Sequence, residues 1–110
     1  MKIHHIFLII FFLFASALSA QEKYTISGYI TDVNNGESIV GANIYCQELN
    51  LGVISNTYGF YSLTLPSGSY DILFSFIGYK SENKTFQLSK SISYDVEFEL
   101  SSIKIDEVVV

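Results

Sequence analysis

From Tyr24 onward, apolar and polar residues alternate with a period of two, the spacing of strands that bury one face. No stretch keeps the 3.6-residue period of a helix for three turns. The inward-facing residues of the predicted strands fall within Tyr24–Ile30, Ala42–Cys46, a weak strand near Val53, Tyr61–Leu65, Tyr70–Phe76, Phe86–Leu88 and Ile92–Leu100. Turn sequences at 34–36, 58–59, 66–68 and 78–79 separate these strands. Six or seven short strands with turns about every 8 to 12 residues favour an all-β sandwich of two antiparallel sheets.

Two of the predicted strands have distinctive patterns. In the last one, apolar residues between Ile92 and Leu100 alternate strictly with Ser93, Asp95, Glu97 and Glu99, which predicts a single regular strand. In the strand that begins at Tyr70, Leu73 and Ile77 place apolar side chains on the second face as well. We therefore expect that strand to be central and covered on both sides.

The first 20 residues have the organisation of a secretory signal peptide. Lys2 supplies a positive start, Ile6–Phe14 is an unbroken apolar run, and Ala15–Ala20 consists mainly of small residues. Ile6–Ala20 is shorter than the roughly 20 apolar residues that a membrane-spanning helix needs. We predict cleavage after Ser19 or Ala20, then one domain over residues 23–100 and a linker over residues 101–110.

Charge and cysteine content narrow the possible partners and the source of stability. Past residue 20 the chain has five lysines, no arginine and eleven acidic residues, a formal charge of −6. Because phosphate contacts need clustered cations, we expect no nucleic-acid partner. Cys46, which lies in the inward phase of its strand, is the only cysteine, so no intramolecular disulfide can form and packing must supply the stability.

The chemistry of most enzymes is missing from the predicted domain. His4 and His5, the only histidines, lie in the predicted signal peptide, and one cysteine cannot build a zinc site. Residues 32–37 weakly resemble a calcium loop, but the glycine is in the fifth position and Asn43 stands where a bidentate Glu is needed. A hairpin turn explains this segment better. We predict a non-enzymatic protein without catalytic residues, metal or cofactor.

Five spaced sequence blocks point to a known family. They are ISGYITD (26–32), GANI (41–44), SNTYGFYSL (55–63), GSY (68–70) and FSFIGYK (74–80). Together they resemble the carboxypeptidase regulatory-like domain, a transthyretin-like Greek-key sandwich common in envelope proteins of Bacteroidota. The resemblance implies a non-catalytic module. It also implies structural roles for the motif residues Gly28, Gly41, Gly59, Gly68, Gly78 and Tyr79.

The family resemblance extends to the end of the chain. Such domains often precede the plug and barrel of TonB-dependent outer-membrane receptors, including SusC-like nutrient importers. The last residues resemble a TonB box, which implies that the C-terminal domain of TonB binds the residues Ile105, Asp106, Glu107, Val108, Val109 and Val110. A β-prone segment of this kind can add as a strand to the sheet edge of a partner. The alternative is that residues 101–110 are a frayed end of the last strand.

The resemblance therefore implies an exported module on the periplasmic face of the outer membrane. Because no plug or barrel comes after Val110, we expect the sequence to be the front fragment of a receptor that touches the membrane only through a downstream barrel. The alternative is a free-standing or differently attached binding or spacer module without TonB contact.

Overall fold

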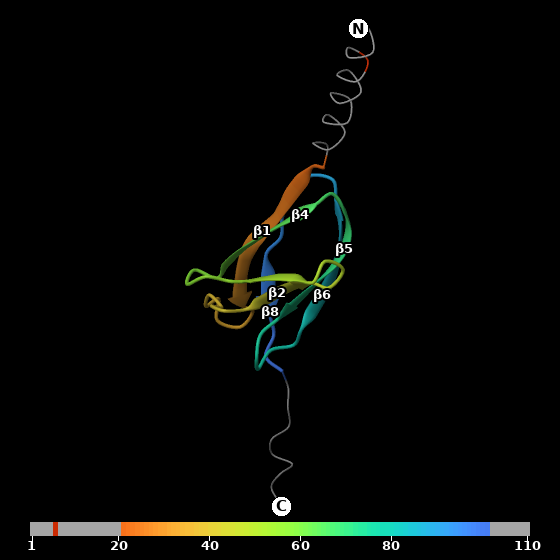
Figure 1. The fold of residues 1–110 in the computed structure, drawn as a ribbon. Helices are drawn as coiled ribbons and strands as arrows, with labels where there is room; N and C mark the ends of the chain where they lie inside the picture. Colours follow the sequence, from red (N-terminus) through yellow and green to blue (C-terminus); the bar gives the residue numbers. More distant parts are fainter. Residues whose placement is uncertain (1–5, 7–20, 102–110) are drawn as a thin grey trace, which may run out of the picture.

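The computed structural model describes residues 21–101 and Ile6 (Figure 1). Residues 21–101 contain eight β-strands, joined by turns and loops, and no helix. The strands are β1 (Lys23–Asp32), β2 (Asn43–Cys46), β3 (Leu51–Ile54), β4 (Phe60–Pro66), β5 (Gly68–Ser75), β6 (Glu82–Leu88), β7 (Ile92–Ser93) and β8 (Val96–Phe98). One sheet has the order β4-β1-β7, with β8 also paired to β1, and the other has the order β3-β2-β5-β6. The prediction of an all-β sandwich is confirmed. Among the described residues, no helix has the length and apolar character needed to cross a bilayer.

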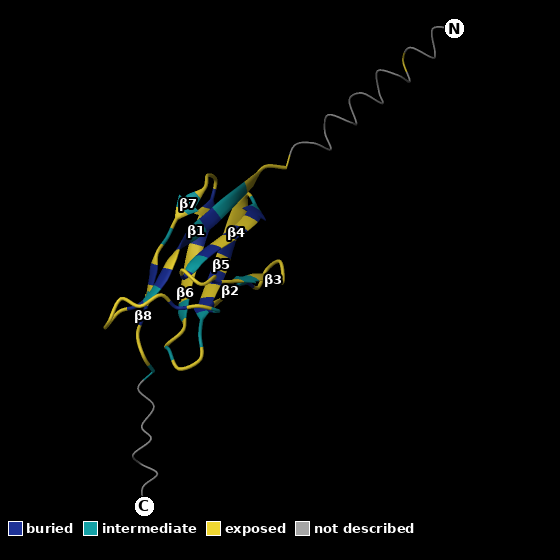
Figure 2. Cartoon of the chain, turned by 90° about the vertical axis from the view of Figure 1, so that its left-hand side faces the viewer, coloured by how far each residue is buried: buried dark blue, intermediate teal, exposed yellow. Residues whose placement is uncertain are grey.

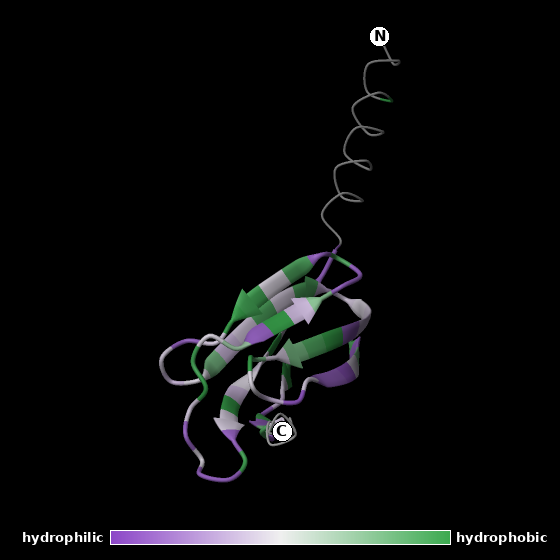
Figure 3. Cartoon of the chain, turned by 90° about the horizontal axis from the view of Figure 1, so that it is seen from below, coloured by the Kyte–Doolittle hydropathy of each residue, from purple (hydrophilic) through white to green (hydrophobic). Residues whose placement is uncertain are grey.

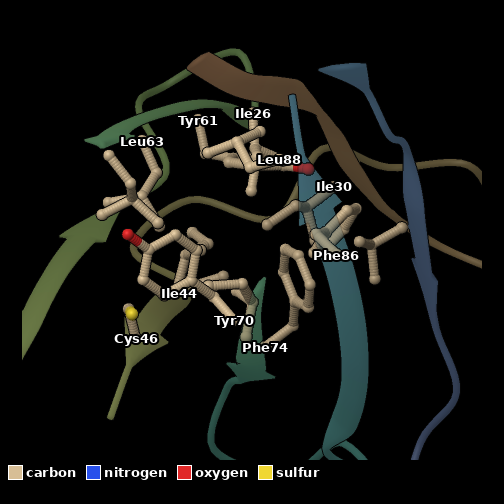
Figure 4. Close-up of a cluster of buried hydrophobic side chains, with 14 of the residues drawn as sticks. Ile26, Ile30, Ile44, Cys46, Tyr61, Leu63, Tyr70, Phe74, Phe86 and Leu88 are labelled. Carbon is tan, nitrogen blue, oxygen red and sulfur yellow. The ribbon is translucent and has the colours of Figure 1, made fainter. Parts of the chain in front are cut away.

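The period-two pattern produces the core between the two sheets. Along β2, β4, β5 and β8, buried residues alternate with more exposed ones, whereas β3 has no buried residue (Figures 2 and 3). The fully buried side chains meet in one cluster (Figure 4), in which the largest are Tyr61, Phe74, Phe98, Ile26, Ile30, Ile44, Leu63, Leu65 and Ile72. Cys46 belongs to this cluster, and burial raises the pKa of its thiol. The core thus rests on aliphatic and aromatic packing without a covalent cross-link.

Strand β1 is the centre of the first sheet and corrects the prediction of purely antiparallel sheets. On one edge it pairs antiparallel with β4, with Ile26 opposite Leu63. On its other edge it pairs parallel with β7 and then with β8, where Ile30 lies opposite Val96. Hydrophobic periodicity reports which face of a strand is buried and carries no information on strand direction.

The predicted single strand over 92–100 is broken into β7 and β8, which is why there are eight strands rather than six or seven. At the break, the Tyr94 N–H donates to the Ser27 carbonyl (2.7 Å), and the Tyr29 N–H donates to the Asp95 carboxylate (2.9 Å). The Tyr94 carbonyl lies against Gly28, where any Cβ would collide with it. The chain can come this close only because residue 28 is a glycine.

Three apolar side chains that the alternation assigned to buried positions are exposed. Leu73 is on the outer face of β5, Ile77 comes after that strand, and Leu100 lies beyond β8. The prediction that the strand beginning at Tyr70 is covered on both faces is therefore wrong. Strand β5 is central within its sheet, but in the described part of the chain its outer face is not covered by a second layer.

Gly59 and Gly78 both have left-handed backbone conformations, with φ of 75° and 88°. They differ in their surroundings. A Cβ on Gly59 would lie 2.6 Å from the Ile30 carbonyl oxygen, whereas nothing lies within 4 Å of a Cβ on Gly78. Gly59 is thus required by both conformation and space, and Gly78 by conformation alone.

This difference predicts unequal effects of the two alanine substitutions. Gly78→Ala should cost about 1–2 kcal/mol of unfolding free energy, the usual penalty for a left-handed L-residue. Gly59→Ala should cost about 1–3 kcal/mol more, because β1 or the Gly59 turn must also move. Urea denaturation of the two variants and the parent protein measures both values. Equal losses would contradict the role assigned to the Ile30 contact.

Candidate functional site

The site of interest is the place where residues 102–110 leave the sandwich, since the predicted TonB-binding residues, Ile105–Val110, lie outside the described residues. The structure describes the chain that leads to them as far as Ser101. Leu100 forms an antiparallel bridge with Tyr79, the Ser101 N–H donates to the Gly78 carbonyl (2.9 Å), and the Lys80 N–H donates to the Glu99 carbonyl (2.9 Å). We call residues 78–80 and 99–101 the exit clamp. It fixes the backbone up to Ser101.

A surface ion pair adds to the exit clamp. The Lys80 ammonium lies 3.5 Å from the Glu99 carboxylate, and both side chains are more than half exposed. Exposed pairs of this kind contribute little stability, so the backbone hydrogen bonds and the packing of Tyr79 hold the clamp together.

Chain entry and chain exit lie at opposite ends of the sandwich. Figure 1 shows β1 starting at one end, while the turn after β5 and the residues after β8 lie at the other. This separation is a consequence of topology, because the first strand β1 and the last strands β7 and β8 run parallel.

Tyr79 joins the exit clamp to both sheets. Its ring packs against Phe76, with the centroids 6.0 Å apart, and against Phe98, with the centroids 5.8 Å apart. Its hydroxyl donates to the Asp32 carboxylate (2.7 Å) at the end of β1. The residue that pairs with Leu100 is therefore held by the C-terminal end of the central strand.

Asp32 is a buried carboxylate with its hydrogen bonds satisfied. Its Oδ1 accepts the Asn34 N–H at 2.7 Å, while Oδ2 accepts the Tyr79 hydroxyl. These hydrogen bonds, that from Tyr79 first, lower the pKa of Asp32 below its usual 3.8. The same bond raises the pKa of Tyr79, because losing its proton would leave two negative charges in contact.

The sequence prediction missed this role of Asp32, although the signal was present. Asp32 belongs to the first sequence block of the family resemblance and to a poor calcium loop, and neither assigns a buried role to its carboxylate. It continues the inward phase of Ile26, Gly28 and Ile30, so the alternation already places its carboxylate on the buried face of β1. A buried carboxylate needs a partner, and tyrosine hydroxyls suit that role.

The predicted motif residues occupy different parts of the fold, and only Gly78 and Tyr79 lie at the exit clamp. Gly28 is in the middle of β1, and Gly59 directly precedes β4. Gly41 lies just before β2, and Gly68 begins β5. The five sequence blocks therefore do not converge on one pocket.

An acidic hollow of about 450 Å³ lies near the break between β7 and β8, lined by Val33, Glu82, Tyr94, Asp95, Glu97 and Glu99. Two of its carboxylates already have partners, since Asp95 accepts the Tyr29 N–H and Glu99 pairs with Lys80. Within residues 21–101, no group of three or more His, Cys, Asp and Glu side chains is placed to hold a metal ion. The hollow is a solvated acidic surface.

Replacing Asp32 with Asn is expected to destabilise the protein most at neutral pH. The folded-state pKa is lowered, so the carboxylate stabilises the fold fully above its usual value of 3.8. That contribution disappears as the pH falls through the lower folded-state pKa. Urea denaturation at a series of pH values should show the difference between the parent and Asp32→Asn narrowing below pH 3.8. Tyr79→Phe removes the main donor and should weaken the pH dependence; a constant difference at all pH values would rule out this assignment.

Solved structures share this fold at low sequence identity. A catechol 1,2-dioxygenase variant of Acinetobacter radioresistens superposes with a TM-score of 0.62 at 12% identity, covering 79% of this chain and 55% of that one. The TIE protein of Bacillus anthracis gives 0.55 at 20% identity, covering 71% of this chain and 17% of that one. A DUF3823 family protein of Bacteroides ovatus gives 0.54 at 17% identity, covering 70% and 44%. At these identities the likeness concerns the fold alone.

Sequence comparison is more specific. TonB-dependent receptor P39 of Formosa agariphila is 33% identical over 93 residues, which is 84% of this chain and 8% of the receptor. The chain thus corresponds to a small part of that relative. The family model described as the CarboxypepD_reg-like domain matches residues 26–110, from the first buried residue of β1 through the end of the sequence. The chain belongs to the CarboxypepD_reg-like domain family.

Proposed function

We propose that this chain is a non-catalytic module of a TonB-dependent outer-membrane receptor. The observation that carries the proposal is the 33% identity to a TonB-dependent receptor over 84% of the chain. Membership in the CarboxypepD_reg-like domain family supports the same function, since it suggests an accessory domain rather than an enzyme.

The proposal includes the location of the module. Residues 1–20 act as an export signal, residues 23–100 form a periplasmic domain, and residues 101–110 connect it to the rest of the receptor. The formal charge of −6 past residue 20 supports a domain that stays off anionic lipid surfaces. Contact with the membrane then comes from the receptor barrel rather than from this domain.

Residues Ile105–Val110 bind the C-terminal domain of TonB by adding a strand to its sheet. The exit clamp supports this role, because it fixes the backbone at Ser101, so that the chain leaves the sandwich at the end opposite to its entry (Figure 1). Strand addition relies on main-chain hydrogen bonds, and valines favour the extended conformation that these bonds need.

Main-chain recognition makes a specific prediction for Val109. Val109→Pro removes an N–H and should weaken binding of the TonB C-terminal domain at least about tenfold if that N–H is bonded. Val109→Ala, the matched control, keeps the N–H and should change the affinity less, by about threefold or under. Neighbouring N–H groups of a strand point in opposite directions, so only one of Val108 and Val109 donates to the sheet of TonB. Val108→Pro, a second variant, tests the case in which the bonded N–H is that of Val108.

Binding is measured by titrating isotope-labelled protein with the TonB C-terminal domain and monitoring the amide signals of residues 103–110. Signals that do not move at saturating partner would disprove the TonB assignment. A change confined to residues 21–101 would instead support an envelope module whose sandwich is itself the binding surface.

A further inference from the structure

An exposed apolar surface lies next to the exit clamp. Ile77 is at the tip of the turn after β5 and is 88% exposed, the highest value among the large apolar side chains of the described part. The Tyr79 N–H donates to the Phe76 carbonyl and closes this turn. The next residue, Gly78, accepts the hydrogen bond from Ser101. The chain therefore leaves the sandwich one residue from its most exposed isoleucine.

A shallow hollow continues this surface across the second sheet. It has a volume of about 490 Å³ and is lined by Gly41, Asn43, Ser75, Phe76 and Ile77. Asn43 pairs with Ser75 on one side and with Ile54 on the other, so these three side chains share the outer face. Ile54, which is 67% exposed, flanks the hollow on the side away from Ile77. We call these six residues the tip surface.

The tip surface suits an apolar extended segment. Two exposed isoleucines stand on either side of a floor made of Gly41, Asn43, Ser75 and the half-buried ring of Phe76, and none of the six residues is charged. Neighbouring strands are about 4.8 Å apart, so the row from Ser75 through Asn43 to Ile54 spans roughly 10 Å. A few extended residues cover this width.

The segment after Ser101 has the required length and composition. Its nine residues include Ile103, Ile105 and Val108–Val110. When extended, nine residues reach about 30 Å, enough to pass Ile77 and cross the hollow to Ile54. Because the segment is tethered beside the surface, its effective concentration there is of the order of millimolar. Any separate apolar partner must compete with this tethered one.

We infer that residues 103–110 dock on the tip surface of the same chain when no partner is bound. The docked segment covers Ile77 and Ile54 with its isoleucines and valines. This inference rests on the proposed function, since it makes the TonB-binding residues part of an internal contact that TonB must displace. Only undocked chains can bind TonB, so docking lowers the apparent affinity for TonB in proportion to the fraction of chains that remain undocked.

The first experiment measures backbone protection in the whole chain without TonB. In the parent protein, amide hydrogen exchange of residues 105–110 should be about 5- to 10-fold slower than in Ile77→Ser. Leu49→Ser, the control, removes an exposed aliphatic side chain from the turn at the other end of β2 and should leave this exchange unchanged. Unchanged exchange of the core amides shows that both variants are folded.

A reciprocal variant tests the contact from the other side. Ile105→Ser combined with Val109→Ser should shift the amide signals of residues 75–78, which the parent sequence holds against the segment. Exchange in residues 105–110 at the rate of an unstructured peptide in the parent, with no effect of Ile77→Ser, would overturn the inference. Protection that rises with protein concentration would also overturn it, in favour of a contact between two copies.

The TonB titration separates this inference from the proposed function. If the segment docks, Ile77→Ser should bind the TonB C-terminal domain about 5- to 10-fold more tightly than the parent, because the exchange rate and the apparent affinity both follow the undocked fraction. Equal affinities together with unprotected residues 105–110 reject the docking while leaving TonB binding intact. If neither the parent protein nor Ile77→Ser binds the TonB C-terminal domain, the proposed function is rejected. The hydrogen-exchange experiment, which contains no TonB, still decides whether the segment docks.

Discussion

The rest of the structure depends on the position of β1 between three other strands. Among the strands of residues 21–101, it alone pairs with β4, β7 and β8, and its inward residues Ile26 and Ile30 are fully buried. Its first residues lie at the chain entry and its last residue, Asp32, reaches the exit clamp through Tyr79. One strand thereby connects the two ends of the sandwich, and the other sheet packs over it. In a chain of this size without a disulfide, losing the pairing of β1 means losing the core.

The sequence predicted the faces of the strands well and their partners poorly. Alternation correctly placed Ile44, Tyr61 and Phe74 inward, because burial of one face is what creates a period of two. It could not show that β7 and β8 run parallel to β1, since direction depends on contacts between residues more than sixty positions apart. The break at Tyr94 was hidden for the same reason. It arises where Gly28 lets a distant carbonyl approach, and a strictly alternating sequence carries no mark of that approach.

The difference between predictable strand faces and unpredictable strand partners also explains which residues at the exit clamp were predicted. Gly78 and Tyr79 were singled out as structural motif residues from a resemblance, and the structure places both in the exit clamp. Asp32 was overlooked because its partner is 47 residues away and turn residues surround it. The exposure of Ile77 and Leu73 was also missed. An apolar residue on the strand face opposite the core gives the same sequence pattern whether a further layer of this chain or a separate partner covers that face. Periodicity alone therefore cannot separate the two cases.

The topology also bears on how a pull on residues 102–110 would act on the sandwich. Because β1 and β8 are parallel and the start of β1 and the exit clamp lie at opposite ends of the sandwich, a pull along the strands loads their hydrogen bonds together rather than one after another. The exit clamp is different. Its bonds, from Lys80 to Glu99 and from Ser101 to Gly78, pair antiparallel segments, so the turn that carries Ile77 bears load before β8 does. Opening that turn moves Phe76 and Ile77, which are part of the tip surface. A force on residues 102–110 would therefore disturb the tip surface first and the β1 pairing last, which leaves the core intact.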